Sequence, residues 1–415
     1  MSSVIRRLRG KISDNQKKRK LPTDSSYVSE AFEELDVPQW SEPPSMVSLF
    51  AGCGGLDYPF HRAGYQAQYV NEFNEEAAAT FNLNFAVPVD TTPIEDVDLS
   101  ALGNTDIVTG GFPCQDFSQI WKRPGLNGTR GNLYTYFLEV VQKTKPKAFV
   151  AENVLGILTA NGGAAIDQII RDFSEIGNGY VVIPKVYNFA DYGVPQLRQR
   201  VILVGIRVDT GFNFVHPPAL RGQPGQPAHR SAGEAFRGID ENLPNSEHMK
   251  IQARTVEILK RIGKGSNFTD IPPGDPYHVK GMISHVYRRI DPDKPSMTLI
   301  AGGGGGTWGY HYPEPRALTN RERARLQSFP DNFVFEGSFT EIRRQLGNAV
   351  PPVGVIPLVN RLNKLFLGEY TKVDLSELHE WMLELPTKKK IALAKSTTPV
   401  DWLEEFAESK NKAVA

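Results

Sequence analysis

Short apolar runs separated by amphipathic stretches organise the first half of the chain. Five runs have the length and composition of buried strands, at residues 46–51, 68–70, 106–109, 148–150 and 201–206. Between the third and fourth runs, residues 133–144 have the apolar spacing of a helix. Strands that alternate with helices favour parallel pairing, so the pattern predicts an α/β fold with a parallel sheet.

The regular alternation of apolar and amphipathic stretches ends after residue 207. Proline pairs at 217–218 and 272–273 and the five glycines at 302–306 interrupt any long element, so we expect irregular, loop-rich structure there. Helical patterns return at 319–328, where Thr319 and Glu322 fit a capping box, and at 353–367. Two further amphipathic stretches follow, at 375–385 and 400–407.

The N-terminal residues are polar and charged, and the pattern predicts ordered structure only from Met46. Residues 1–20 hold eight Lys/Arg and one acid, a net charge of +7 in a chain whose total is zero. Such an arm could follow phosphates or could be a solvated, flexible tail. We therefore treat residues 1–45 as a basic, flexible arm.

The chain has 415 residues, of which 40% are hydrophobic, and this suggests two or three domains. No apolar run approaches the ~20 residues that span a bilayer, and no secretory signal is visible. Its two cysteines exclude a disulfide framework and a four-cysteine zinc site. We expect no metal and a cytoplasmic location.

A glycine turn follows the first predicted strand, in the order Phe50-Ala51-Gly52-Cys53-Gly54-Gly55. Such a turn between strand and helix lets a ligand approach the backbone. Glu72, 20 residues after Gly52, stands where a carboxylate can bind ribose hydroxyls. The alternative is a packing turn with a surface glutamate.

Three further groups are candidates for chemistry. Cys114 follows the third predicted strand and could be a nucleophile, although alone it fits a buried thiol better; Cys53 is interpreted as a packing residue. Glu152 follows the fourth strand and could donate a proton, or could be a surface carboxylate. Arg198 and Arg200 alternate along extended chain and could face phosphate or an aromatic ring, or form salt bridges.

Together these segments resemble the cytosine-5 DNA methyltransferases, in order and spacing, across residues 46–366. The matching segments are 50–55, 111–118, 152–154, 196–200, 316–330 and 345–352. The resemblance implies an S-adenosylmethionine-dependent, Rossmann-like large domain plus a small irregular target recognition domain. The implied boundaries are 46–205 and 316–366 for the large domain, 206–315 for the small one and 367–415 for a C-terminal helical extension.

The resemblance also implies roles for individual residues. Cys114 would attack cytosine C6, Glu152 would hold N3 and the exocyclic amine, and Arg198 and Arg200 would support the flipped base. The implied cofactor contacts are Phe50, Gly52, Cys53, Gly54, Gly55, Glu72, Phe73, Asp90, Pro113, Leu133, Asn348 and Val350. The expected DNA contacts are Gln115, Ser118, Arg288, Arg289, Gly303, Gly304, Trp308 and His311. Asp90 is followed by Thr91, which departs from the usual Asp-Ile pair of the family.

The implied activity is transfer of a methyl group from S-adenosylmethionine to C5 of a cytosine flipped out of a specific duplex DNA site. We expect a monomer that protects host DNA from a cognate restriction endonuclease. One alternative is the tRNA-methylating branch, whose Cys-Phe-Thr signature this chain has no third cysteine to supply. A catalytically inactive DNA-binding homologue is the other, although every expected catalytic residue is present.

Overall fold

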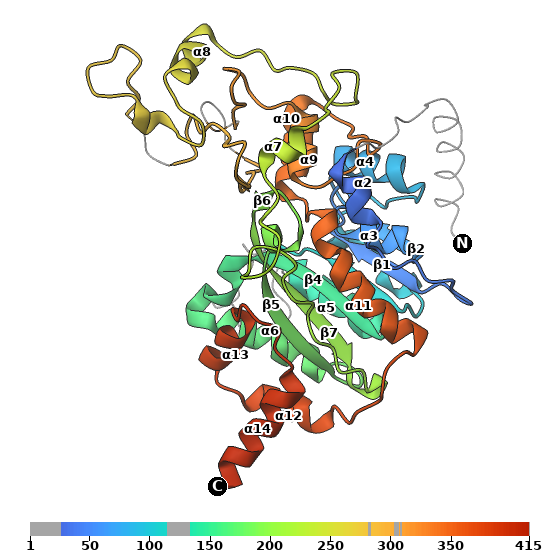
Figure 1. The fold of residues 1–415 in the computed structure, drawn as a ribbon. Coiled ribbons are helices and arrows are strands. Elements are labelled where there is room, and N and C mark those ends of the chain that lie inside the picture. Colours follow the sequence, from blue (N-terminus) through green and yellow to red (C-terminus); the bar gives the residue numbers. More distant parts are fainter. Residues whose placement is uncertain (1–25, 114–132, 281–283, 303–306, 308, 415) are drawn as a thin grey trace.

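The computed structural model describes residues 26–113, 133–280, 284–302, 307 and 309–414. A six-stranded sheet lies at its centre, with the strand order β2-β1-β3-β4-β7-β5. The strands are β1 (Ser45–Leu49), β2 (Gln66–Asn71), β3 (Ile107–Gly110), β4 (Ala148–Val154), β5 (Tyr180–Asn188) and β7 (Gln199–Arg207). The predicted α/β fold is confirmed, with each of the five predicted strands present (Figure 1).

The sheet is mixed, so the prediction of a parallel sheet holds only for its first four strands. Strands β1, β2, β3 and β4 pair in parallel, whereas β7 runs antiparallel between β4 and β5. The link from β5 to β7 is only residues 189–198, too short for a parallel crossover. Sequence patterns missed β5, which carries Pro184; a proline is tolerated there because β5 is an edge strand.

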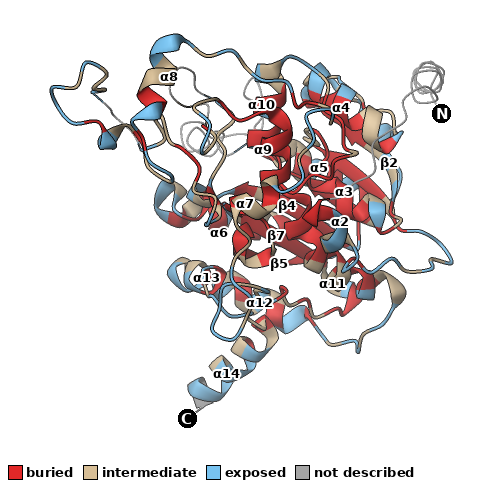
Figure 2. Cartoon of the chain, turned by 45° about the horizontal axis from the view of Figure 1, so that its top comes forward, coloured by how far each residue is buried: buried red, intermediate tan, exposed pale blue. Residues whose placement is uncertain are grey.

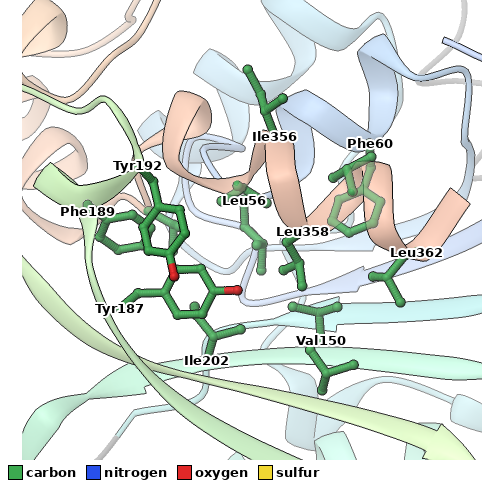
Figure 3. Close-up of a cluster of buried hydrophobic side chains, with 14 of the residues drawn as sticks. Leu56, Phe60, Val150, Tyr187, Phe189, Tyr192, Ile202, Ile356, Leu358 and Leu362 are labelled. Atoms are coloured by element: carbon green, nitrogen blue, oxygen red, sulfur yellow. The ribbon is translucent and has the colours of Figure 1, made fainter. Parts of the chain in front are cut away.

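Helices cover both faces of the sheet and bury alternate residues of its strands. On one face, α3 (Asp57–Arg62) and α11 (Ile356–Leu367) pack against a cluster that includes Met46 and Val150. Figure 3 shows Leu358 and Leu362 of α11 directed at this cluster. On the other face lie α5 (Leu133–Thr144) and α6 (Ala164–Glu175). The result is a three-layer core whose buried residues follow the sheet (Figure 2).

The segment after β7 is irregular, as predicted, and its residues 253–260 lie at the end of the molecule opposite the C-terminus (Figure 1). Its helices are α7 (Ala232–Phe236) and α8 (Ala253–Lys260). Strand β8 (Ser296–Met297) pairs in parallel with β6 (Gln196–Leu197), which ties the segment to the large domain.

The chain then returns to the sheet through three helices. These are α9 (Asn320–Leu326), α10 (Phe339–Asn348) and α11. The predicted capping box is present, because the Thr319 side chain accepts from Glu322 N and the Glu322 carboxylate accepts from Thr319 N. A further helix, α4 (Glu75–Phe85), follows β2 and contacts α10.

Ordered structure begins before Met46, so the predicted flexible arm is wrong for residues 26–44. Helix α2 (Tyr27–Phe32) buries Tyr27 and Val28. The Tyr27 hydroxyl donates to the Arg325 carbonyl at 2.6 Å, and Trp40 Nε1 donates to the Ala63 carbonyl at 2.7 Å. Aromatic contacts made at long sequence separation leave no local period, so the sequence pattern did not reveal them. Residues 1–25 lie outside the described residues.

The C-terminal residues form α12 (Ser376–Glu384), α13 (Thr387–Ala394) and α14 (Trp402–Val414). Lys390 of α13 is fully buried and pairs with Asp167 of α6 at 2.6 Å. Lys185 of β5 donates to the Thr398 carbonyl at 3.0 Å. The extension is therefore part of the packed structure. In the described part of the chain, no helix is long and apolar enough to cross a membrane.

Gly205 tests how tightly the sheet packs at its centre. It lies opposite Phe149 in the β4–β7 register, and a Cβ at residue 205 would come within 2.0 Å of the buried Phe149 ring. We predict that Gly205→Ala lowers stability by about 1–3 kcal/mol, the usual effect of overpacking, and lowers the midpoint of thermal denaturation. Gly103→Ala, with open space around its added carbon, should leave the midpoint unchanged. Equal midpoints for the two variants would contradict the packing described.

Candidate active site

The carboxyl ends of β1, β3 and β4 bring the predicted groups to one edge of the sheet. Leu49, Gly110 and Ala151 are register partners across these three strands. The residues that follow them, Phe50, Gly111 and Glu152, therefore lie on neighbouring strand ends. Ligands bind at this edge in open α/β sheets.

The glycine turn after β1 closes around the carboxylate of Glu72. Gly52 N donates to Glu72 Oε2 at 2.8 Å, and Asn74 N donates to Oε1 at 2.9 Å. Burial raises the pKa of Glu72, and the two amide hydrogen bonds oppose that rise. Phe50 precedes the turn with φ of 53°, and a Cβ at Gly52 would meet open space. The turn and Glu72 thus form one cradle that leaves room for a ligand beside Gly52.

The last predicted motif packs directly onto this turn. A Cβ at Gly55 would lie 2.3 Å from the Val350 carbonyl oxygen, so only glycine allows the approach. Cys53 faces the core, and burial raises the pKa of its thiol to about 12. The Cys53 side chain is therefore a packing group, and only its backbone can face a cofactor.

The other expected cofactor residues differ in exposure. Phe73 is 67% exposed, and Asn348 is exposed at the end of α10. Asp90 accepts from the Tyr69 hydroxyl at 2.9 Å and from Thr92 N at 3.0 Å. Both carboxylate oxygens of Asp90 already have protein donors, which fits its departure from the family pattern.

Some predicted residues lie outside the described residues. They are Cys114, Gln115, Ser118, Gly303, Gly304 and Trp308. Pro113 and Leu133 are described and flank residues 114–132.

Glu152 is a buried carboxylate paired with Arg200. Arg200 Nε lies 2.9 Å from Glu152 Oε1, and both side chains are largely buried. Burial raises the pKa of Glu152, while the charges of Arg200 and Arg198 oppose the rise. A carboxyl with a raised pKa can exchange a proton near neutral pH.

The stem that leads to Cys114 is fixed to this carboxylate. Asn153 Nδ2 donates to the Phe112 carbonyl at 2.8 Å. A Cβ at Gly111 would lie 3.3 Å from Glu152 Oε2, so the stem backbone passes close beside the acid. The predicted sharing of one edge by Glu152 and the stem is therefore seen up to Pro113.

Arg198 is fully buried and serves the scaffold. Its guanidinium donates to the carbonyls of Gly347 at 2.9 Å, Asn348 at 3.3 Å and Leu299 at 3.4 Å. Burial and the neighbouring Arg200 lower the pKa of Arg198 to about 9. The two arginines do lie together near Glu152, but in this structure Arg198 holds chain segments and Arg200 holds the acid.

A cavity of about 390 Å³ separates the irregular segment from α9 and α10. Its lining includes the basic residues Arg288, Arg289, Lys294, Arg323 and Arg343. The apolar side chains of Leu197 and Met297, 38% and 44% exposed and opposite each other in the β6–β8 pair, also line it. A basic cavity with an apolar edge suits a ligand that carries both phosphates and rings.

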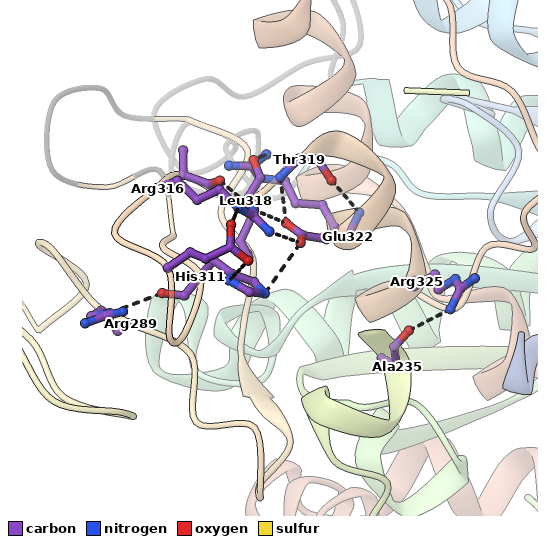
Figure 4. Close-up of polar contacts among 11 residues, drawn as sticks. Ala235, Arg289, His311, Arg316, Leu318, Thr319, Glu322 and Arg325 are labelled. Atoms are coloured by element: carbon purple, nitrogen blue, oxygen red, sulfur yellow. Dashed lines mark hydrogen bonds and ion pairs between the residues drawn. The ribbon is translucent and has the colours of Figure 1, made fainter. Parts of the chain in front are cut away.

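Two of the expected DNA contacts are corrected. Arg289 is 5% exposed, and its guanidinium donates to the carbonyls of Leu259 at 2.9 Å, Ile262 at 2.8 Å and His311 at 3.1 Å. His311 is largely buried between Phe236 and Glu322, with its Nε2 3.7 Å from Glu322 Oε1 (Figure 4). Both residues hold the irregular segment together, because its buried carbonyls have no strand partners.

Sequence patterns missed the buried arginines of the returning helices. Arg321 donates to the carbonyls of Pro244 at 2.9 Å and Phe333 at 2.8 Å. Arg325 forms a two-contact ion pair with Asp331, at 2.9 and 2.7 Å, and donates to the Ala235 carbonyl at 3.2 Å (Figure 4). Charged residues at alternate helix positions normally indicate solvent exposure, so no local signal could have revealed them.

Comparisons with known proteins identify the family to which this chain belongs. The sequence model of the C-5 cytosine-specific DNA methylases matches residues 45–364. The chain therefore belongs to the family of C-5 cytosine-specific DNA methylases, the class that the six motifs predicted. Within the described ranges, no group of three or more His, Cys, Asp or Glu is arranged to hold a metal ion.

Two curated relatives match along most of their length. The Type II methyltransferase M.NgoFVII of Neisseria gonorrhoeae is 54% identical over 349 residues, which are 83% of this chain and 92% of the relative. The Type II methyltransferase M.BbvI of Brevibacillus brevis is 38% identical, covering 79% of this chain and 92% of the relative.

Solved structures share the fold. A protein assigned as a DNA modification methyltransferase encoded within an E. coli prophage has a TM-score of 0.61 at 21% identity, over 78% of this chain and 99% of its own. The S. pombe Dnmt2 methyltransferase has a TM-score of 0.54 at 18% identity, over 78% and 99%. The predicted methyltransferase fold is thus confirmed.

The Glu152–Arg200 pair predicts a pH-dependent stability effect. Because Arg200 opposes the raised pKa of Glu152, Arg200→Met should raise that pKa further. A carboxyl whose folded pKa exceeds its unfolded value costs stability as pH rises through that interval. The loss in melting temperature caused by Arg200→Met should therefore grow as the pH rises above the ordinary pKa range of a glutamate.

Glu152→Gln supplies the control for this effect, because it removes the titrating group. In that background, Arg200→Met should cost the same stability at every pH. A loss that is constant with pH in the otherwise unchanged protein would contradict the proposed coupling.

Proposed function

We propose that the protein methylates C5 of a cytosine in a specific duplex DNA site, with S-adenosylmethionine as methyl donor and Cys114 as nucleophile. The observation that carries this proposal is the buried Glu152–Arg200 pair beside Gly111, at the stem that leads to Cys114. An acid held next to a candidate thiolate is the arrangement that addition to a pyrimidine ring requires.

The residues at the glycine turn fit S-adenosylmethionine. Glu72 presents a carboxylate at the end of β2 that could accept from ribose hydroxyls, and Gly52 leaves room beside it. Phe73, exposed next to Glu72, offers an aromatic face for the adenine ring. When bound, S-adenosylmethionine supplies an electrophilic methyl group.

The chain's own groups would activate the cytosine. The Cys114 thiolate adds to C6, forming the S–C6 bond, and the ring electrons that this addition releases make C5 nucleophilic. Glu152 gives or shares a proton at N3, which neutralises the charge that develops on the ring. After C5 carries the methyl group, a water base takes the C5 proton, the C–H electrons restore the C5–C6 double bond, and the S–C6 bond breaks to release the Cys114 thiolate. The proton at N3 returns to Glu152.

The target base must leave the helix for this chemistry. C6 and C5 are stacked within duplex DNA, and extrusion of the base costs a few kcal/mol. Phosphate contacts from Arg288 and Lys294 at the basic cavity would offset part of that cost. Arg200 would hold the Glu152 carboxyl in place until the base arrives.

The biological role that fits best is modification within a restriction system, in the cytoplasm. Two relatives named Type II methyltransferases, at 54% and 38% identity, support this role. Bisulfite sequencing of DNA from an expressing host would identify the methylated site. Transfer of labelled methyl groups to tRNA and not to duplex DNA would favour the tRNA-methylating alternative.

We predict that Cys114→Ala abolishes methyl transfer to DNA while S-adenosylmethionine still binds, because the variant removes the nucleophile and leaves the glycine turn intact. Labelled-methyl transfer and calorimetric titration of the cofactor measure the two properties. Cys53→Ala is the matched thiol control and should retain transfer. Unchanged turnover by Cys114→Ala would exclude the proposed mechanism.

Glu152→Gln should lower the single-turnover rate by roughly 10²–10⁴-fold, the range typical of a lost general acid, with a much smaller effect on DNA affinity. Rapid-quench methylation and filter binding measure the rate and the affinity. A variant that loses DNA affinity and keeps its rate would indicate a purely structural role for Glu152.

A further inference from the structure

Asp57 is a buried carboxylate that the proposed chemistry does not use. It is the first residue of α3, directly after the glycine turn, and is 1% exposed. An acid in the first turn of a helix normally reaches solvent while it stabilises the helix dipole. Asp57 instead turns inward, toward the sheet.

The Asp57 carboxylate links the first turn of α3 to the strand that leads to the nucleophile. Thr109 Oγ1 of β3 donates to Asp57 Oδ1 at 2.8 Å. Ser48 of β1 is the register partner of Thr109, and its hydroxyl lies near the same carboxylate without a hydrogen bond to it. One hydrogen bond thus joins α3 to β3.

The two residues of this bridge lie next to the two proposed reaction partners. Thr109 lies five residues before Cys114. Asp57 begins the helix that leaves the glycine turn. The bridge therefore joins the exit from the cofactor turn to the strand that leads to the nucleophile.

Retaining a carboxylate here costs stability. Burial raises the pKa of Asp57 to about 6, and the groups that oppose this rise are the two hydroxyls and a backbone amide, none of them cationic. An apolar residue would avoid that cost. A buried polar group that costs stability is consistent with a demand for precise placement.

We propose that Asp57 is a positioning residue, which sets the distance between the methyl donor at the glycine turn and the cytosine held at Cys114 through its hydrogen bond to Thr109. This inference rests on the proposed function. Misplacement of reacting groups by about 1 Å can lower a rate by 10²-fold, so loss of the bridge should act on the chemical step.

The test compares single-turnover rate constants with binding and stability. Asp57→Ala and Thr109→Val should each lower the single-turnover methylation rate constant at least tenfold. Affinity for S-adenosylhomocysteine and for DNA should change less than about threefold. Because both changes remove one bridge, the double variant should be no slower than Asp57→Ala alone.

Two further variants separate positioning from other roles. Asp57→Asn keeps an oxygen that accepts from Thr109, so it should restore the rate constant to within about threefold of the unmodified protein. Thr144→Val is the matched control. It removes a buried hydroxyl that donates to the Val140 carbonyl at 2.8 Å, on α5 and away from the turn, and should lower the melting temperature without changing the rate constant.

Each other result overturns the proposal. If Asp57→Ala and Thr109→Val lower only the melting temperature and the active fraction, the bridge is scaffolding. If Asp57→Asn is as slow as Asp57→Ala, the charge is what matters and the hydrogen-bonded bridge is not. Absence of methyl transfer by the unmodified protein would refute the proposed function itself, whereas normal transfer by all variants would refute only the role of Asp57.

Discussion

The buried guanidinium of Arg198 is the contact on which the arrangement of the site depends. Its donors satisfy carbonyls at Leu299, Gly347 and Asn348, in segments that lie about 100 and 150 residues farther along the chain. Removal of this cation would leave buried carbonyls without donors, at about 1–3 kcal/mol for each group. The same contact holds the end of α10 near Val350, which packs against the glycine turn. Leu299 and Gly347, whose carbonyls accept from Arg198, also line the basic cavity, so Arg198 stabilises both the glycine turn and the cavity.

In the irregular segment and where it meets α9, arginine side chains supply the hydrogen-bond donors that neighbouring strands supply in a sheet. Buried backbone carbonyls need donors, and the described residues between 208 and 318 contribute only the two-residue strand β8 to a sheet. Arg289 supplies donors within the segment, and Arg321 and Arg325 supply them from α9. A planar guanidinium with five N–H groups in a fixed geometry can serve several carbonyls at once, with more donors than the three of a lysine. The shape of the segment therefore depends on residues that resemble surface charges in the sequence.

Three carboxylates are buried near the carboxyl ends of the strands, and each has a different kind of partner that opposes the rise in its pKa. Burial raises the pKa of Glu152, Glu72 and Asp57 alike. Arginine opposes the rise at Glu152, backbone amides oppose it at Glu72, and hydroxyls oppose it at Asp57. The same carboxyl group is thus tuned differently at the three positions by its local environment.

The sequence alone determined the fold class, the five predicted strands, the capping box at Thr319 and the order of motifs that places Glu152 beside the stem of Cys114. Each of these depends on local periodicity or on strand ends that meet at one edge of a sheet. Only the tertiary structure decided that β7 is antiparallel, that residues 26–44 are packed, and that Arg198, Arg289 and His311 hold the scaffold. Those outcomes depend on which distant carbonyl or ring meets each side chain, and contacts between residues far apart in the chain leave no period in the sequence.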